Sequence, residues 1–185
     1  MAEILYESPN IEQFSIEFAG PEHGWLEIYF KIEGGQPFLI EASDVYPPFR
    51  SLKKWLEDML DYDTIPSESL KIDCESYNVV LSYVFMGYNA SDGTYDPIVQ
   101  IRASDDIDRK DISNDYEPEI QFVVPVKLFV SKFYYSLKGY LETNRQIFRK
   151  HWRVPNGEWF DFRAVMRSLA SKKIEQTLGR VDWSS

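Results

Sequence analysis

The chain has 185 residues, a length that fits one compact domain. Its composition, 44% hydrophobic, 16% aromatic and 27% charged, excludes a disordered or fibrous protein. The apolar stretches are far shorter than the roughly 20 residues that span a bilayer, and the first residues lack the pattern of a secretory signal. Because Cys74 is the single cysteine, no internal disulfide can form. We therefore expect a cytoplasmic protein.

Charge is divided unevenly along the chain. Residues 1–126 contain 25 acidic and 8 basic residues, whereas residues 127–185 contain 5 acidic and 12 basic ones. The formal net charge of −10 makes nucleic acid an unsuitable partner for the whole chain, and no membrane partner is predicted. Two interpretations of the asymmetry stay open. The basic C-terminal helices lie on an acidic sheet and neutralise it, or the separated charges steer association with a partner.

Strands are predicted first along the chain. The clearest lies in 24–33, where apolar and polar residues alternate with the period of two of a half-buried strand. A turn at Gly34-Gly35 joins it to a strand over 38–42 as a hairpin. A strand over 77–88 is apolar on both faces, which predicts a central position. The remaining predicted strands cover 4–7, 14–18, 70–75, 98–103 and 120–124.

Helices are predicted where the apolar spacing changes to three and four residues. One spans about 48–61 after Pro47-Pro48, a longer one spans about 126–150, and a third spans about 160–178 before Gly179. We predict an α+β fold: an antiparallel sheet of about six or seven strands, two helices packed on one face, and a C-terminal helical extension. The chain is expected to be a single domain over 1–185, with an α+β core at 1–150 and the extension at 151–185.

Common catalytic motifs are absent. The chain has no GxGxxG, GxxxxGK[ST], GxSxG or HExxH motif, and its two histidines and one cysteine are too few for a metal site of that type. Glu27 and Glu41 lie on neighbouring predicted strands, and such a pair can act as acid and base when about 5 to 9 Å apart in a cleft. With 30 acidic residues in the chain, such pairs also arise by chance. We predict a non-enzymatic protein without a cofactor or metal.

An acidic segment is the candidate partner-binding site. Alignment with an EF-hand loop starting at Asp106 gives oxygen ligands at positions 1, 3, 9 and 12. However, Lys110 occupies a ligand position, and Asp111 replaces the glycine that forms the sharp turn. A solvated acidic loop is therefore expected, and it could hold a basic partner through charge complementarity. Its seven acidic residues are Asp105, Asp106, Asp108, Asp111, Asp115, Glu117 and Glu119.

Aromatic and basic residues are combined around a Pro-Asn-Gly turn near the C-terminus, over 151–160. Trp152, Arg153 and Trp159 could form a binding surface, or stack on single-stranded nucleic acid. The preferred interpretation is that the tryptophans pack a corner between helices, with the arginine covering an aromatic ring.

The run from Asp44 to Glu57 resembles a group of uncharacterised small bacterial proteins. In that group an Asp, then Pro-Phe, then Leu-x-x-Trp-Leu-Glu recurs; here these are Asp44, Pro48-Phe49 and residues 52–57. Some members of the group look like immunity proteins of toxin systems. The resemblance implies an inhibitor of a toxin and carries over no catalytic residue.

Our leading hypothesis is a non-enzymatic cytoplasmic binding protein of the immunity-inhibitor type, whose acidic surface holds a basic protein such as a nuclease toxin. The first alternative is a small-molecule enzyme or ligand-binding domain with a pocket lined by aromatic and carboxylate side chains. The second is a self-associating structural protein, that is, a homo-oligomer.

Overall fold

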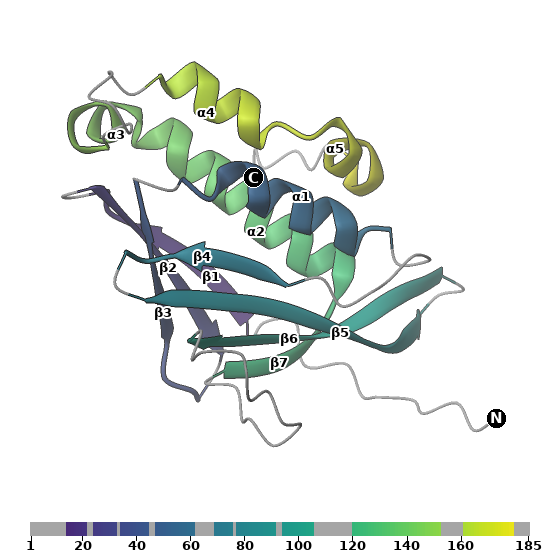
Figure 1. Ribbon diagram of the computed structural model, residues 1–185. Helices are drawn as coiled ribbons and strands as arrows, with labels where there is room; N and C mark the ends of the chain where they lie inside the picture. Colours follow the sequence, from purple (N-terminus) through teal and green to yellow (C-terminus); the bar gives the residue numbers. More distant parts are fainter. Residues whose placement is uncertain are drawn as a thin grey trace.

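The computed structural model describes residues 14–21, 24–32, 34–44, 47–61, 69–75, 77–91, 94–105, 120–152 and 161–179, with the backbone alone at 89–91, 94–96 and 105. Within these ranges the chain forms seven strands and five helices, drawn in Figure 1. The predicted α+β class and the antiparallel pairing of the strands are confirmed. The predicted strand at 4–7 lies outside the described residues.

The strands form two sheets, so the prediction of a single sheet is wrong. The smaller sheet has the order β1-β2-β3 and the larger one β4-β5-β6-β7. The chain passes through α1 between β3 and β4, so no hairpin joins these two strands. Instead, Ser43 and Glu41 of β3 are linked to the turn after β4 by side-chain hydrogen bonds. The strands are β1 (Phe14–Ala19), β2 (Trp25–Ile32), β3 (Phe38–Ser43), β4 (Leu70–Asp73), β5 (Asn78–Ser91), β6 (Thr94–Asp105) and β7 (Ile120–Pro125).

Local sequence patterns explain the individual strands. In β2, Leu26, Ile28 and Phe30 are buried, while the residues between them are half-buried on the opposite face. The predicted hairpin at Gly34-Gly35 is confirmed, because β2 and β3 pair antiparallel on either side of it. β5 pairs with β4 and β6, so its predicted central position is confirmed as well.

The helices are shorter and more numerous than the two core helices and one extension that we predict. They are α1 (Phe49–Met59), α2 (Val126–Thr143), α3 (Arg145–His151), α4 (Phe162–Leu169) and α5 (Lys172–Leu178). The predicted helix over 126–150 is interrupted at Asn144, whose side-chain amide donates to the Tyr140 carbonyl. The predicted C-terminal helix is interrupted at Ala170, which is extended, and Ser171 then caps α5 by accepting from the amide of Ile174.

Aromatic rings fill the space between the two sheets and the helices. The ring of Phe129 on α2 stacks on Phe30 of β2 at a centroid distance of 6.4 Å. It also meets Trp55 of α1 edge-on at 5.9 Å and Phe122 of β7 at 6.2 Å. Phe129 therefore ties both sheets and both long helices to one core.

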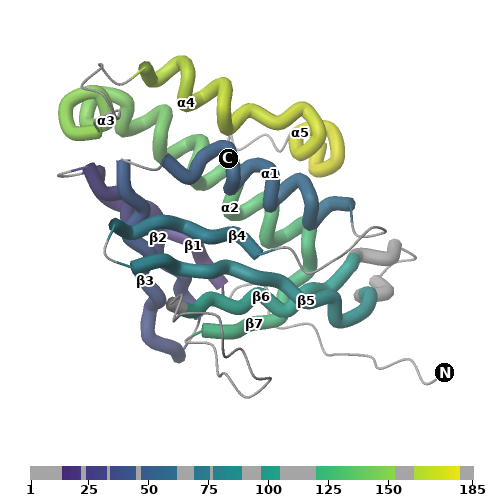
Figure 2. Tube along the Cα trace, in the orientation of Figure 1, coloured from purple at the N-terminus to yellow at the C-terminus, as the bar shows by residue number. Residues whose placement is uncertain are grey.

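The C-terminal helices form an outer layer. Figure 1 shows α4 and α5 on the side of α1 and α2 that is turned away from both sheets, and the tube in Figure 2 gives the same arrangement. This position does not support the interpretation that α4 and α5 lie on an acidic sheet and neutralise it. α2, the first helix of the basic part, does pack on β1 and β6, and its Lys132 donates to the Phe14 carbonyl.

Candidate functional site

Two glutamates face each other on the outer side of the smaller sheet. Glu27 of β2 and Glu41 of β3 are direct cross-strand partners, as expected from the hairpin that joins these strands. Their neighbours Leu26, Ile28 and Ile40 are fully buried, so the glutamates lie on the face opposite the core, where both are half-buried. Like charges directly opposite each other in an antiparallel pair destabilise the sheet. The arrangement therefore needs an explanation other than stability.

Hydroxyl groups, rather than cations, accompany these carboxylates. Tyr29 donates to Glu27 at 2.8 Å, and Tyr77, which precedes β5, is 3.5 Å from the Glu41 carboxylate. In the part of the chain that the structure describes, neither Glu27 nor Glu41 forms an ion pair. Both carboxylates thus have lone pairs available for a cation from outside the molecule.

The tyrosines respond to this negative charge. The hydrogen bond to Glu27 raises the pKa of Tyr29, and the charge of Glu41 acts in the same direction. Burial raises the pKa of Tyr140 on α2, with a smaller contribution from the charge of Glu27. The negative potential of the pair therefore extends from the sheet to neighbouring aromatic side chains.

A third carboxylate comes from the turn between β4 and β5. Glu75 is exposed, and its φ of 61° is in the left-handed region that is uncommon for a residue other than glycine. Its carboxylate accepts from the buried Ser43 hydroxyl at 2.7 Å, which holds the turn against β3. Such backbone outliers persist where surrounding contacts fix them and are frequent at functional sites. We call Glu27, Glu41 and Glu75, with Tyr29 and Tyr77, the acidic sheet face.

The predicted acidic segment begins close to this face. The backbone of Asp105 ends β6 and pairs with Val79, two residues along β5 from Tyr77. The segment therefore starts at the end of the larger sheet that meets β3. The residues aligned with an EF-hand loop lie outside the described residues. So do the other predicted binding residues of the segment, which are Asp106, Asp108, Asp111, Asp115, Glu117 and Glu119.

Trp152 belongs to the core, as the packing interpretation of the basic and aromatic stretch expects. Its ring lies 5.6 Å from Phe49 and 5.5 Å from Phe148, and 3% of the residue is exposed. Residues 153–160 of that stretch lie outside the described residues. The single cysteine, Cys74, is also buried, and burial raises the pKa of its thiol to about 11. Trp152 and Cys74 are therefore not accessible to a partner at the surface.

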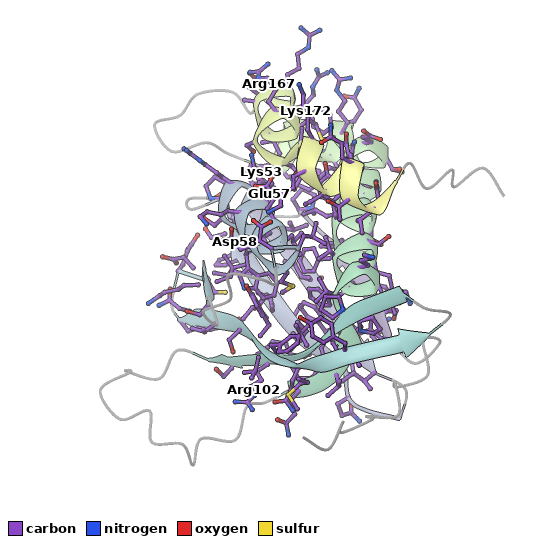
Figure 3. All side chains as sticks on the ribbon, turned by 90° about the vertical axis from the view of Figure 1, so that its right-hand side faces the viewer. Lys53, Glu57, Asp58, Arg102, Arg167 and Lys172 are labelled. Carbon is purple, nitrogen blue, oxygen red and sulfur yellow. The ribbon has the colours of Figure 1, made fainter. Side chains whose placement is uncertain are left out.

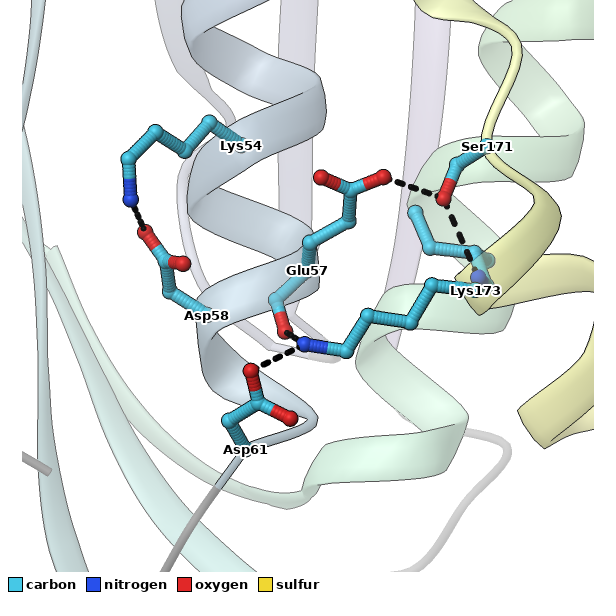
Figure 4. Close-up of polar contacts among 7 residues, drawn as sticks. Lys54, Glu57, Asp58, Asp61, Ser171 and Lys173 are labelled. Carbon is cyan, nitrogen blue, oxygen red and sulfur yellow. Dashed lines mark hydrogen bonds and ion pairs between the residues drawn. The ribbon is translucent and has the colours of Figure 1, made fainter. Parts of the chain in front are cut away.

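A polar network attaches the C-terminal helices to α1 and α2. The Ser171 hydroxyl donates to Glu57, and Lys173 binds the Glu57 carbonyl and the Asp61 carboxylate (Figure 4). Buried Tyr134 accepts from the Ser171 amide at 3.0 Å and donates to Glu175 at 3.1 Å. Burial raises the pKa of Tyr134 to about 12. These groups satisfy one another, so the network is structural rather than a site open to a ligand.

Sequence patterns predict only part of this site. The cross-strand position of Glu27 and Glu41 follows from the hairpin, but no local signal brings Tyr77 and Glu75 to β3.

Within the described ranges, no helix combines the length and apolar character needed to cross a membrane. Among the same residues, no group of three or more histidine, cysteine or acidic side chains could share a metal ion.

Comparisons of the chain with protein-family models, with curated proteins and with solved structures give no match.

Proposed function

We propose that the protein is a non-enzymatic, cytoplasmic binding protein that holds a basic protein partner on the acidic sheet face. The observation that carries the proposal is the direct opposition of Glu27 and Glu41, two half-buried carboxylates that are accompanied by hydroxyls and that have no cation beside them among the described residues. A lysine or arginine from a partner would remove their mutual repulsion, so binding would recover free energy that the free protein lacks.

The acidic segment would extend this surface. The backbone of Asp105 ends β6 opposite Val79, so the segment with seven acids from Asp105 to Glu119 begins at the end of the larger sheet that meets β3. A wide acidic surface accelerates encounter with a basic protein and makes the association sensitive to salt. An inhibitor of the immunity type, which must find a basic toxin quickly, has this requirement.

Retention of a basic protein from a lysate of the native host tests the proposal. Three immobilised forms would be compared with the wild type: a Glu27→Gln/Glu41→Gln variant, a variant with the seven acids of 105–119 neutralised, and a control. The control Asp58→Asn/Glu142→Gln removes two negative charges from the helices instead. We expect one basic protein to be retained by the wild type and the control and lost from the other two.

The purified partner would then be titrated directly at several salt concentrations. The proposal requires a weaker affinity for the Glu27→Gln/Glu41→Gln variant than for the control, and a shallower dependence on salt. Equal affinity of the variant and the control would exclude the acidic sheet face as the binding surface.

A further inference from the structure

The outer helical layer carries exposed basic side chains that have few acidic partners among the described residues. Arg163 and Lys172 are exposed, and in the part of the chain that the structure describes they form no ion pair. Arg167 is exposed as well, and its one acidic partner among the described residues is Asp161, at 3.5 Å, with both side chains more than half exposed. Figure 3 shows Arg167 and Lys172 at the helical end of the molecule, with Lys53 of α1 below them and next to Glu57. We call Lys53, Arg163, Arg167 and Lys172 the basic helical face.

Among the described residues, the acidic side chains of α1 and α5 and of Asp61 after α1 are already engaged by other groups. Glu57 accepts from Ser171, Asp61 pairs with Lys173, and Glu175 pairs with Lys138 at 2.9 Å. Asp58 pairs with Lys54 within α1. Within the described ranges, Arg163 and Lys172 are therefore exposed without a carboxylate partner, although the chain as a whole has a formal net charge of −10.

We propose that the basic helical face docks on the acidic sheet face of a second copy of this chain. Within the described residues the complementary surfaces are both present: Arg163 of α4 and Lys172 of α5 form no ion pair, and the carboxylates of Glu27 and Glu41 have no cation beside them. They lie on different sides, since α1 and α2 separate α4 and α5 from the sheets (Figure 1). The contact is heterologous, with two different patches meeting, and it places arginine against carboxylate.

Ionic strength decides whether this local attraction prevails over the repulsion between two negative molecules. At about 0.1 M salt the Debye length is about 10 Å, so repulsion between distant charges is screened while contacting pairs still attract. At about 1 M the Debye length is about 3 Å, and the contact itself weakens. Because the contact is charged rather than apolar, we expect a weak association that depends on protein concentration.

Sedimentation velocity of the full chain tests the inference, with salt and protein concentration varied. At about 0.1 M salt the weight-average mass of the wild type should rise with concentration toward at least two chain masses, and at about 1 M it should return to one. Arg163→Glu/Arg167→Glu should remain a monomer throughout. The control Arg102→Glu/Lys127→Glu makes the same change in net charge away from the basic helical face, with Arg102 at the opposite end in Figure 3, and should associate like the wild type.

A charge swap separates a specific contact from a general effect of charge. Glu27→Lys/Glu41→Lys should also be monomeric alone, but its mixture with Arg163→Glu/Arg167→Glu should associate, because the exchanged charges are again complementary. A wild type that is monomeric under all these conditions, or association that survives Arg163→Glu/Arg167→Glu, overturns the inference. The proposed function is judged separately, because the variant of the basic helical face leaves the acidic sheet face intact for a basic partner.

Discussion

Repulsion between Glu27 and Glu41 can be measured with a double-mutant cycle. The perturbations are Glu27→Gln, Glu41→Gln and the two together; glutamine keeps the size of the side chain and can still accept from the tyrosine hydroxyls. If the pair is held together at a cost to the sheet, removing either charge should raise the free energy of unfolding. Because either substitution removes the whole repulsion, the double variant should gain little more than one single variant.

The cross-strand geometry sets the magnitude. Cβ atoms of directly opposed residues are about 5 Å apart, and two unit charges at that distance repel by about 0.8 kcal/mol in water and about 3 kcal/mol at an effective dielectric constant of 20. Because Glu27 and Glu41 are half-buried on a face that meets solvent, we expect a coupling energy of about 1 kcal/mol. For a chain of 185 residues, this corresponds to a shift in Tm of about 2 to 4 °C.

Urea unfolding followed by tryptophan fluorescence measures these free energies. Glu142→Gln removes an exposed charge on α2 and should change the free energy of unfolding by less than about 0.5 kcal/mol. Raised salt should reduce the coupling between Glu27 and Glu41. The reasoning is refuted if both single variants are less stable than the wild type, or if their effects add without coupling. The carboxylates would then stabilise the free protein and need no partner.

Three further predictions concern the core and the C-terminal helices. Tyr134→Phe should lower the free energy of unfolding, measured in urea, by about 2 to 3 kcal/mol, because it leaves the buried Ser171 amide without an acceptor. The control Tyr135→Phe loses an exposed hydrogen bond to the Gly179 carbonyl and should lower it by less than about 1 kcal/mol. Phe129→Ala should cost about 3 to 5 kcal/mol by the same measurement. The free energy of unfolding should fall as pH rises from about 9 to 12. In the folded chain the pKa is about 11 for Cys74 and about 12 for Tyr134, so the unfolded chain releases both protons at lower pH than the folded chain does. The difference in free energy of unfolding between the wild type and Tyr134→Phe should become smaller over this range.

Local periodicity predicts the elements better than their assembly. The alternation in β2 and the apolar stripe of α1 place both elements, because burial of one face dictates the pattern. The division into two sheets depends on contacts between distant residues, such as Ser43 with Glu75, which leave no local pattern. The apolar stripe also runs through Asn144, so periodicity alone misses the interruption that its side-chain bond to Tyr140 marks.

The candidate site shows the same division. A glycine turn between two strands predicts that Glu27 and Glu41 are neighbours, and the structure confirms that they are direct partners. Tyr77 and Glu75 reach the same face from the larger sheet, through tertiary packing that a single sequence does not encode in its spacing. The charge asymmetry is visible in the sequence, whereas the positions of α4 and α5 outside α1 and α2 come only from the fold.

The most direct test of the central claim is the affinity of the basic partner for Glu27→Gln/Glu41→Gln compared with Asp58→Asn/Glu142→Gln. Both variants lose two negative charges, so a general effect of net charge would weaken them equally. A cationic group seated on the acidic sheet face predicts at least a tenfold loss of affinity for the first variant, which corresponds to about 1.4 kcal/mol, and a small loss for the second. Equal losses, or no basic protein retained by the wild type at any salt concentration, would contradict the account.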